Sequence, residues 1–270
     1  MSGGIFADTH HSMHDPYQPG NSVIHRLDAR VKLLLTIALI VTGALAAPGA
    51  WIVYVLLLTV TLSAAILSEL GVGYVLRRSL LVLPFMLAAL PVLFAQPGAA
   101  LLSWAQLSLT VAGLERFLGV VFKSWISLQA AIVLVATTPM PDLLLALRAL
   151  RLPGLLVSMT GLMWRYLFLM IEEVQRLLRA RLARSSVASD GRRGGGTLIW
   201  RAQVAGGMVG SLLVRSFERS DRVYAAMLAR GYDGEIRLLP RPPAAVWNVV
   251  VLVAGLLFFA FVTVLGVLYA

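Results

Sequence analysis

The segment LMWRYLFLMIEEVQRLLRARLARS, residues 162–185, decides the fold of this chain because its pattern is that of a long amphipathic helix. Apolar residues recur at every fourth position and form one continuous ridge, which consists of Leu162, Tyr166, Met170, Val174, Leu178 and Leu182. The helix leads into Ala183-Arg184-Ser185. The polar, glycine-rich residues 185–196 then end it.

A second helix of the same kind is predicted from about Leu198 to Arg230. Its apolar residues point roughly one way and comprise Val209, Leu213, Phe217, Tyr224 and Leu228. It ends in Ala229-Arg230-Gly231, where Gly231 suits the left-handed backbone conformation that terminates many helices. On its surface, Glu218 and Arg222 have the i, i+4 spacing of an ion pair.

The two endings repeat one signature, alanine–arginine–small residue, with Arg184 and Arg230 at the ends of two comparable helices. Each arginine would present a guanidinium that can bind a partner's carboxylates or carbonyls through two hydrogen bonds. The surrounding block, residues 139–243, holds 16 of the 23 Lys and Arg residues of the chain.

Three interpretations of this basic block compete. Attraction to anionic lipid explains some of the charges, with Arg192 and Arg193 as candidates. Nucleic-acid binding is disfavoured, because the aromatic residues belong to the apolar ridges. Lipid attraction does not require repetition, so the duplicated ending favours a docking module for a cytoplasmic protein.

The rest of the chain has the composition of a polytopic membrane protein. It is 59% hydrophobic and 13% charged, whereas soluble domains have about 25% charged residues. There is no cysteine, which excludes disulfides and thiolate chemistry. Five segments approach the roughly 20 residues that cross a bilayer. They cover about residues 30–47, 51–67, 79–95, 117–137 and 246–269.

Two features inside these spans carry expectations of their own. Pro84 and Pro91 predict a kink in the third span, since proline removes a backbone donor and clashes with the preceding turn. Lys123, in the outer half of the fourth span, is expected to extend toward the membrane interface.

The basic residues also predict the topology. They precede the first span, separate the second from the third and follow the fourth. Basic loops stay on the cytoplasmic side, so the N-terminus is predicted to be cytoplasmic. The membrane is predicted to be the bacterial inner membrane. The fold class is an all-α membrane protein with about five transmembrane helices. Its parts are a cytoplasmic N-terminal segment (1–28), four transmembrane helices (29–137), a cytoplasmic helical module with two long amphipathic helices (138–243) and a final transmembrane helix (244–270).

Several kinds of chemistry have no residues to support them. No glycine-rich loop ends in Lys-Ser or Lys-Thr, so ATP binding by a P-loop is not expected. The spans lack carboxylates and histidines, which argues against a proton relay or an intramembrane metalloprotease. His10, His11 and His14 could hold a divalent transition metal, although a mobile polar tail is the simpler interpretation. We therefore expect a non-catalytic protein that binds no cofactor of its own.

Three motifs resemble those of one family, the T components, or transmembrane coupling subunits, of energy-coupling-factor (ECF) transporters. Residues 25–34 (HRLDARVKLL) look like the opening motif, Asp-Pro-Arg-x-Lys, with Ala29 in place of proline. Residues 218–232 (ERSDRVYAAMLARGY) are very similar to the second coupling motif, and residues 179–185 (RARLARS) resemble the first, with Ser185 where glycine is frequent. The similarity is greatest to the cobalt-transport branch, CbiQ.

The resemblance implies a role between other subunits. T components lie between a membrane-embedded substrate-binding S component and two cytoplasmic ABC ATPases, and their coupling helices dock into grooves of the ATPases. Carried over by position, the ATPase-coupling residues are Ala183, Arg184, Ser185, Ala229, Arg230 and Gly231. Residues that support the second coupling helix are Glu218, Arg219, Arg222 and Met227.

The implied partners are two CbiO-like ATPase subunits, a CbiM-like substrate-binding component with a CbiN-like subunit, and membrane lipid. ATP would be used by the partner ATPase, and the cargo would be cobalt ions. Alternatives remain open: the same coupling role for nickel or a vitamin, a conventional ABC importer permease with its own substrate path, and a membrane scaffold or receptor without an ATPase.

Overall fold

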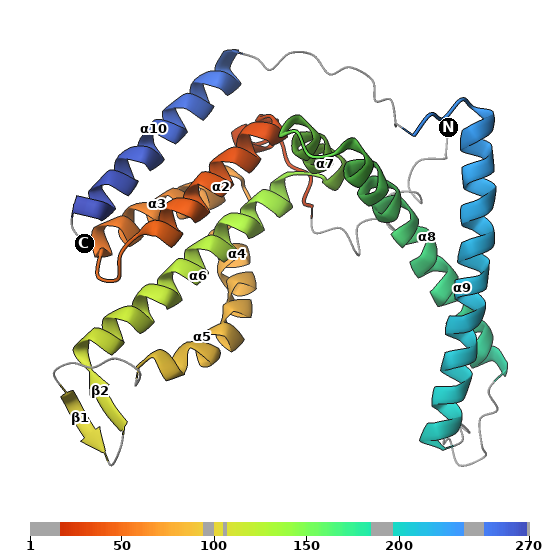
Figure 1. Cartoon of the computed structure of the whole chain (residues 1–270), viewed down its shortest axis with the longest axis horizontal. Coiled ribbons are helices and arrows are strands. Elements are labelled where there is room, and N and C mark those ends of the chain that lie inside the picture. The colour runs from red at the N-terminus through yellow and green to blue at the C-terminus, as the bar shows by residue number, and fades with distance from the viewer. Residues whose placement is uncertain (1–16, 94–99, 105–106, 185–196, 235–245, 269–270) are drawn as a thin grey trace. The chain divides into compact units, whose positions relative to one another are not determined.

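The chain forms two compact units, which are described separately. The computed structural model describes residues 17–93, 100–104, 107–184, 197–234 and 246–268. The first unit contains residues 1–150 and 241–270, and the second contains residues 151–240. Figure 1 shows the helices that make up each unit.

The first unit is almost wholly helical, which confirms the predicted fold class. Its elements are α1 (Val23–Arg26), α2 (Ala29–Leu45), α3 (Trp51–Leu67), α4 (Val72–Ser79), η1 (Leu80–Val82), α5 (Leu83–Ala89), η2 (Leu90–Leu93), β1 (Ala100–Trp104), β2 (Leu107–Thr110), α6 (Val111–Thr137), α7 (Met140–Ala149) and α10 (Val246–Leu268). The short antiparallel β1–β2 hairpin is an addition that the sequence analysis did not predict.

Several helices are long and apolar enough to cross a membrane. By length and composition these are the run Val72–Leu93, α6, α10 and, in the second unit, α8 (Gly154–Arg184). Helices α2 and α3 have 17 residues each, or about 26 Å of helix, slightly less than the ~30 Å hydrocarbon layer. The sequence analysis assigned α8 to a module outside the bilayer, and that assignment stays a prediction.

The third span begins earlier than predicted and is bent. It runs from Val72 to Leu93 instead of starting near residue 79. The basic pair Arg77 and Arg78 suggested a later start, but both residues lie exposed within α4. The Arg78 guanidinium lies 5.1 Å from the centre of the Tyr74 ring. The 3₁₀ turns η1 and η2 interrupt the run, with Pro84 in the first turn of α5 and a second proline in η2. The predicted kink is therefore confirmed.

Two lysines link α2 to α6, one near each end of α2. The buried ammonium of Lys32, near the start of α2, donates to the main-chain oxygen of Thr137 at 2.9 Å, where α6 ends. Lys123, on α6, donates to the main-chain oxygen of Ala44 at 3.2 Å, where α2 ends. Helix C-termini carry partial negative charge, so each lysine stabilises the end of the neighbouring helix.

The opening motif builds the corner where α2, α6 and α7 meet. Asp28 caps α2 by accepting a hydrogen bond from the Arg30 main-chain N–H at 3.0 Å. The three helices meet around a buried apolar cluster, which consists of Ala29, Leu33, Leu134 and Ala146. Helix α7, which the sequence analysis grouped with the coupling module, contacts α2 and belongs to the first unit.

Candidate coupling site

Two long helices form the second unit. Helix α8 has 31 residues, and α9 (Leu198–Ala229) has 32. Thr197 caps the start of α9, because its side-chain oxygen accepts a hydrogen bond from the Trp200 main-chain N–H at 3.3 Å. Both predicted amphipathic helices are present. Helix α9 ends within one residue of its predicted bounds, whereas α8 begins at Gly154, eight residues before the predicted ridge starts at Leu162.

A hydrogen-bonded ion pair joins α8 to α9. The carboxylate of Glu173 is buried and accepts a hydrogen bond from the Arg215 guanidinium at 2.6 Å. Arg176, one turn further along α8, lies 3.5 Å from the second oxygen of the same carboxylate. The sequence does not predict this pair, because the adjacent Glu172 and Glu173 give no sign of which one is buried.

The face of α9 that lies against α8 is not the predicted ridge. The half-buried apolar residues of α9 are Val204, Met208, Leu212, Val223 and Met227. In contrast, the predicted ridge is exposed, with Val209 at 65% and Phe217 at 63% of full exposure. Both rows of apolar residues have helical spacing. The row beside Arg215 faces α8, because the Glu173–Arg215 bond turns that side of α9 toward α8.

The second arginine signature has a well-defined geometry. Gly231 has φ +80°, so the left-handed helix terminus predicted at this glycine is confirmed. The Gly231 N–H donates to the Leu228 oxygen at 2.9 Å, and the Tyr232 N–H donates to the Met227 oxygen at 3.0 Å. This pair of bonds is the Schellman motif. It fixes the backbone on both sides of Arg230, which is exposed.

The first signature begins in the last described turn of α8. Ala183 and Arg184 are the last two residues of α8, and both are exposed. Ser185 lies outside the described residues. Both arginines thus stand at a helix C-terminus with solvent-accessible side chains, as the sequence predicted.

The two signatures lie at opposite ends of the helix pair (Figure 1). Counting from the Glu173–Arg215 contact, Arg184 is about 16 Å along α8 and Arg230 about 22 Å along α9, at 1.5 Å per residue. The structure therefore separates the two arginines along the helix pair.

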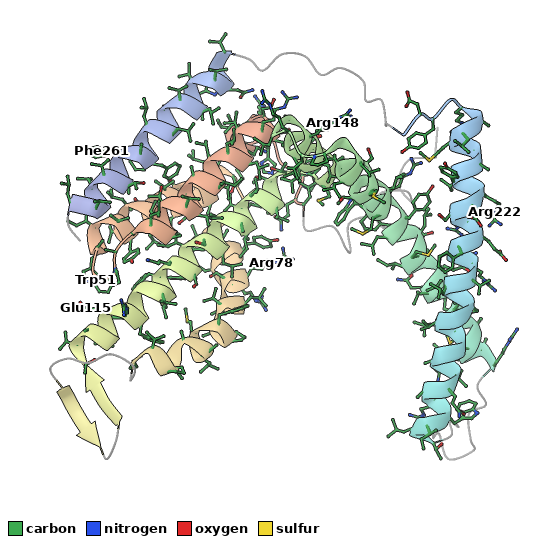
Figure 2. The ribbon with its side chains drawn as sticks, in the orientation of Figure 1. Trp51, Arg78, Glu115, Arg148, Arg222 and Phe261 are labelled. Atoms are coloured by element: carbon green, nitrogen blue, oxygen red, sulfur yellow. The ribbon has the colours of Figure 1, made fainter. Side chains whose placement is uncertain are left out.

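The four supporting residues lie on the C-terminal half of α9. Glu218 and Arg222 form the predicted ion pair, at 4.0 Å, on the exposed surface. Figure 2 labels Arg222 on this helix. Arg219 and Met227 are half-buried. Exposed pairs of this kind contribute little to stability, so Glu218 and Arg222 remain available for other contacts.

Within the described segments of the chain, no three His, Asp or Glu side chains gather in a way that could hold a metal ion. The three histidines considered as metal ligands, His10, His11 and His14, lie outside those segments.

Together these features define a class of protein: a polytopic helical membrane protein with a separate two-helix module that ends in paired arginine signatures. The model of the CbiQ family, described as cobalt transport protein, matches residues 20–239. The chain therefore belongs to the CbiQ cobalt transport protein family.

The chain is also similar to individual proteins, two of which have transporter names. The chain is 28% identical to the energy-coupling factor transporter transmembrane protein EcfT of Lactococcus lactis subsp. cremoris, over 81% of this chain and 83% of the relative. It is 30% identical to the cobalt transport protein CbiQ of Rhodobacter capsulatus, over 58% of this chain and 63% of the relative. An uncharacterised protein of Methanocaldococcus jannaschii is 24% identical over 94% of this chain and 85% of its own length.

Proposed function

We propose that this chain is the transmembrane coupling subunit of an ATP-driven importer of the energy-coupling-factor type, with cobalt ions as cargo. The membership of the CbiQ family and the names of the relatives support the transporter class. The observation that carries the coupling role is the second unit, in which two long helices present exposed arginines at opposite ends.

In this proposal, Arg184 and Arg230 each dock on one of two ABC ATPase subunits. Their guanidiniums bind acidic side chains or main-chain oxygens in the ATPase grooves. The ATPases bind and hydrolyse ATP, and this chain is non-catalytic. Closure of the ATPases displaces the ends of α8 and α9. The Glu173–Arg215 bond makes the two helices respond as one body.

The exposed ridge of α9 takes a second role. Its apolar side chains, from Val209 to Leu228, form a surface for the membrane-embedded substrate-binding component, which would be CbiM-like and accompanied by a CbiN-like subunit. Motion of α9 thereby reaches the component that holds the cargo. The N-terminus lies in the cytoplasm, and the protein resides in the inner membrane.

The test is uptake by proteoliposomes that contain this chain, the ATPase subunits and the substrate-binding component. We expect ATP-dependent accumulation of cobalt that is lost when this chain or the ATPase is left out. Competition with nickel and with vitamins then assigns the cargo. Uptake by this chain without an ATPase, or without the substrate-binding component, would contradict the proposal and favour a permease with its own path.

A further inference from the structure

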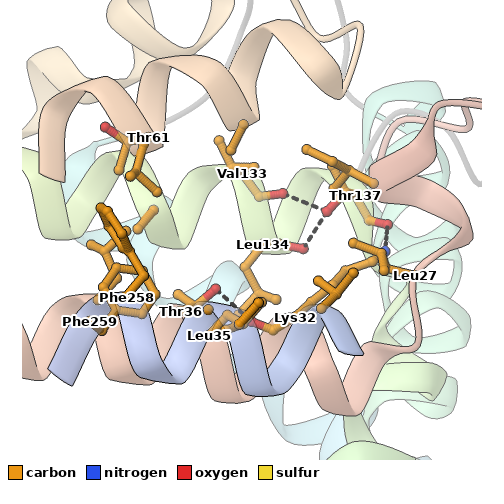
Figure 3. A pocket seen from close by; sticks show the side chains of 18 residues that line it. Leu27, Lys32, Leu35, Thr36, Thr61, Val133, Leu134, Thr137, Phe258 and Phe259 are labelled. Atoms are coloured by element: carbon orange, nitrogen blue, oxygen red, sulfur yellow. Dashed lines mark hydrogen bonds between the residues drawn. The ribbon is translucent and has the colours of Figure 1, made fainter. Parts of the chain in front are cut away.

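The first unit contains an apolar cavity that has no part in the proposed coupling role. It has a volume of about 430 Å³ and lies among α2, α3, α6 and α10 (Figure 3). Most of its lining is aliphatic or aromatic, including Leu35, Val133 and Phe259. The cavity is partly open, and Phe258 and Ala254 on its α10 wall are exposed.

The polar side chains of the lining are already bound within the protein. These are Lys32, Thr36, Thr61 and Thr137. Lys32 donates to the main-chain oxygens of Thr137 and His25, and to the Thr138 hydroxyl.

The threonine hydroxyls of the lining are bound in the same way. Thr36 donates to the Lys32 main-chain oxygen and Thr137 to that of Val133, both at 2.8 Å, as Figure 3 shows. Thr61 donates to the Leu58 main-chain oxygen at 2.9 Å. An occupant therefore meets mainly hydrocarbon, which suits an apolar chain and disfavours a hydrated ion.

The position of the cavity along α2 indicates how such a chain would enter. One end is lined by Ile24 and Leu27, beside the exposed Arg26 and Arg30. Along α2 the lining extends from Lys32 to Leu39, a rise of about 10 Å. The cavity thus starts at the basic end of the spans and extends about a third of the way across a ~30 Å hydrocarbon layer.

We propose that this cavity binds one acyl chain of an anionic membrane phospholipid, with the headgroup at Arg26 and Arg30. The apolar lining accepts the chain, and the two exposed arginines attract the negative headgroup. Such a lipid fills the space between α10 and the other spans. The basic end of α2 therefore has a lipid-binding role in addition to the helix corner made by the opening motif.

The experiment uses the full chain in phosphatidylcholine vesicles that contain phosphatidylglycerol with a photoreactive diazirine in one acyl chain. After illumination, labelled residues are mapped by mass spectrometry. We expect labels on the cavity wall, at Val60, Ala64 and Ala254. The Ala254→Phe variant fills the cavity and should lose most of this label. Ala260→Phe, on an exposed position of α10 outside the lining, should keep it.

A second arm tests the headgroup. The Arg26→Gln/Arg30→Gln variant should lose about fivefold in phosphatidylglycerol labelling for each arginine, while labelling by phosphatidylcholine with the same diazirine stays unchanged. Ala64→Leu repeats the filling test with a smaller side chain, and thermal unfolding confirms that each variant is folded.

Three results would overturn the proposal. The first is label spread evenly over the exposed surface of α10. The second is equal labelling of folded Ala254→Phe and wild-type protein. The third is loss of the wall label on assembly with the substrate-binding component, because the cavity would then be a site for a partner helix.

Discussion

The buried carboxylate of Glu173 on α8 accepts a hydrogen bond from Arg215 on α9 at 2.6 Å, and this bond links the two helices that carry the arginine signatures. The residues are 42 positions apart in the sequence. Apolar contact between the helices is sparse, since much of α9 is exposed. The ion pair is therefore a principal constraint on how α8 and α9 are held.

Glu173→Gln and Arg215→Gln should each loosen the helix pair. Removing one partner leaves a buried polar group poorly satisfied, at a cost of about 1–3 kcal/mol. The lower part of that range is expected, because the Arg215 side chain is more than half exposed. Hydrogen exchange of α8 and α9 in detergent measures the effect. Arg222→Gln, in the exposed pair with Glu218, is the matched control and should leave exchange unchanged. Unaltered exchange in both test variants would show that the bond does not hold the pair.

Lys32→Met should destabilise the first unit. The Thr137 oxygen loses its charged donor, at a cost of about 1–3 kcal/mol. Each 1 kcal/mol corresponds to roughly 2–4 °C in a domain of 150–250 residues. The measurement is thermal unfolding in detergent, with the exposed Arg116→Gln as control. An equal melting temperature for Lys32→Met and wild type would show that Lys32 does not stabilise the end of α6.

Gly231→Val should weaken ATPase docking without unfolding α9. A β-branched side chain at φ +80° is strained, by roughly 1–2 kcal/mol, so the terminus rearranges and Arg230 is presented differently. ATPase binding to the purified chain is the measurement. Gly207→Val, in an open part of α9 with helical backbone, is the control for adding the same side chain. Binding that falls equally in both variants would count against a specific role for the Schellman terminus.

Gly113→Ala should disturb the junction of α6 with the kinked third span. An added Cβ at Gly113 would collide with the main-chain oxygen of Leu93 in η2, which cannot move aside as a side chain can. We expect a fall in thermal stability, within the 1–3 kcal/mol typical of overpacking. Gly73→Ala, which meets nothing within 4 Å, is the control and should not be destabilised. A stable Gly113→Ala protein would indicate that η2 and α6 separate freely.

Local patterns predicted much of the fold. Apolar runs located α2, α3, α6 and α10, the prolines located the kink, and Gly231 located the end of α9, because each feature depends on residues close in sequence. The Glu218–Arg222 pair followed from helical spacing for the same reason.

Contacts between distant residues were beyond the sequence. Lys32 meets Thr137 across 105 residues, and no local pattern marks either residue as the other's partner. The contact face of α9 was missed because two apolar rows lie side by side on that helix, and the Glu173–Arg215 bond decides between them. The positions of Arg184 and Arg230 at helix ends were predictable. That they lie at opposite ends of the helix pair could not be predicted, because it depends on how α8 and α9 run relative to each other.

Binding of the ATPase subunits to charge-reversed arginine variants tests the central claim most directly. Arg184→Glu and Arg230→Glu, singly and together, are compared with Arg165→Glu, an exposed arginine within α8 away from either signature. Reversal should cost each contact about 2–5 kcal/mol, so the double variant should lose the ATPases and ATP-dependent uptake while Arg165→Glu keeps both. Wild-type ATPase binding and uptake by the double variant would contradict the claim that force from ATP enters this protein through Arg184 and Arg230.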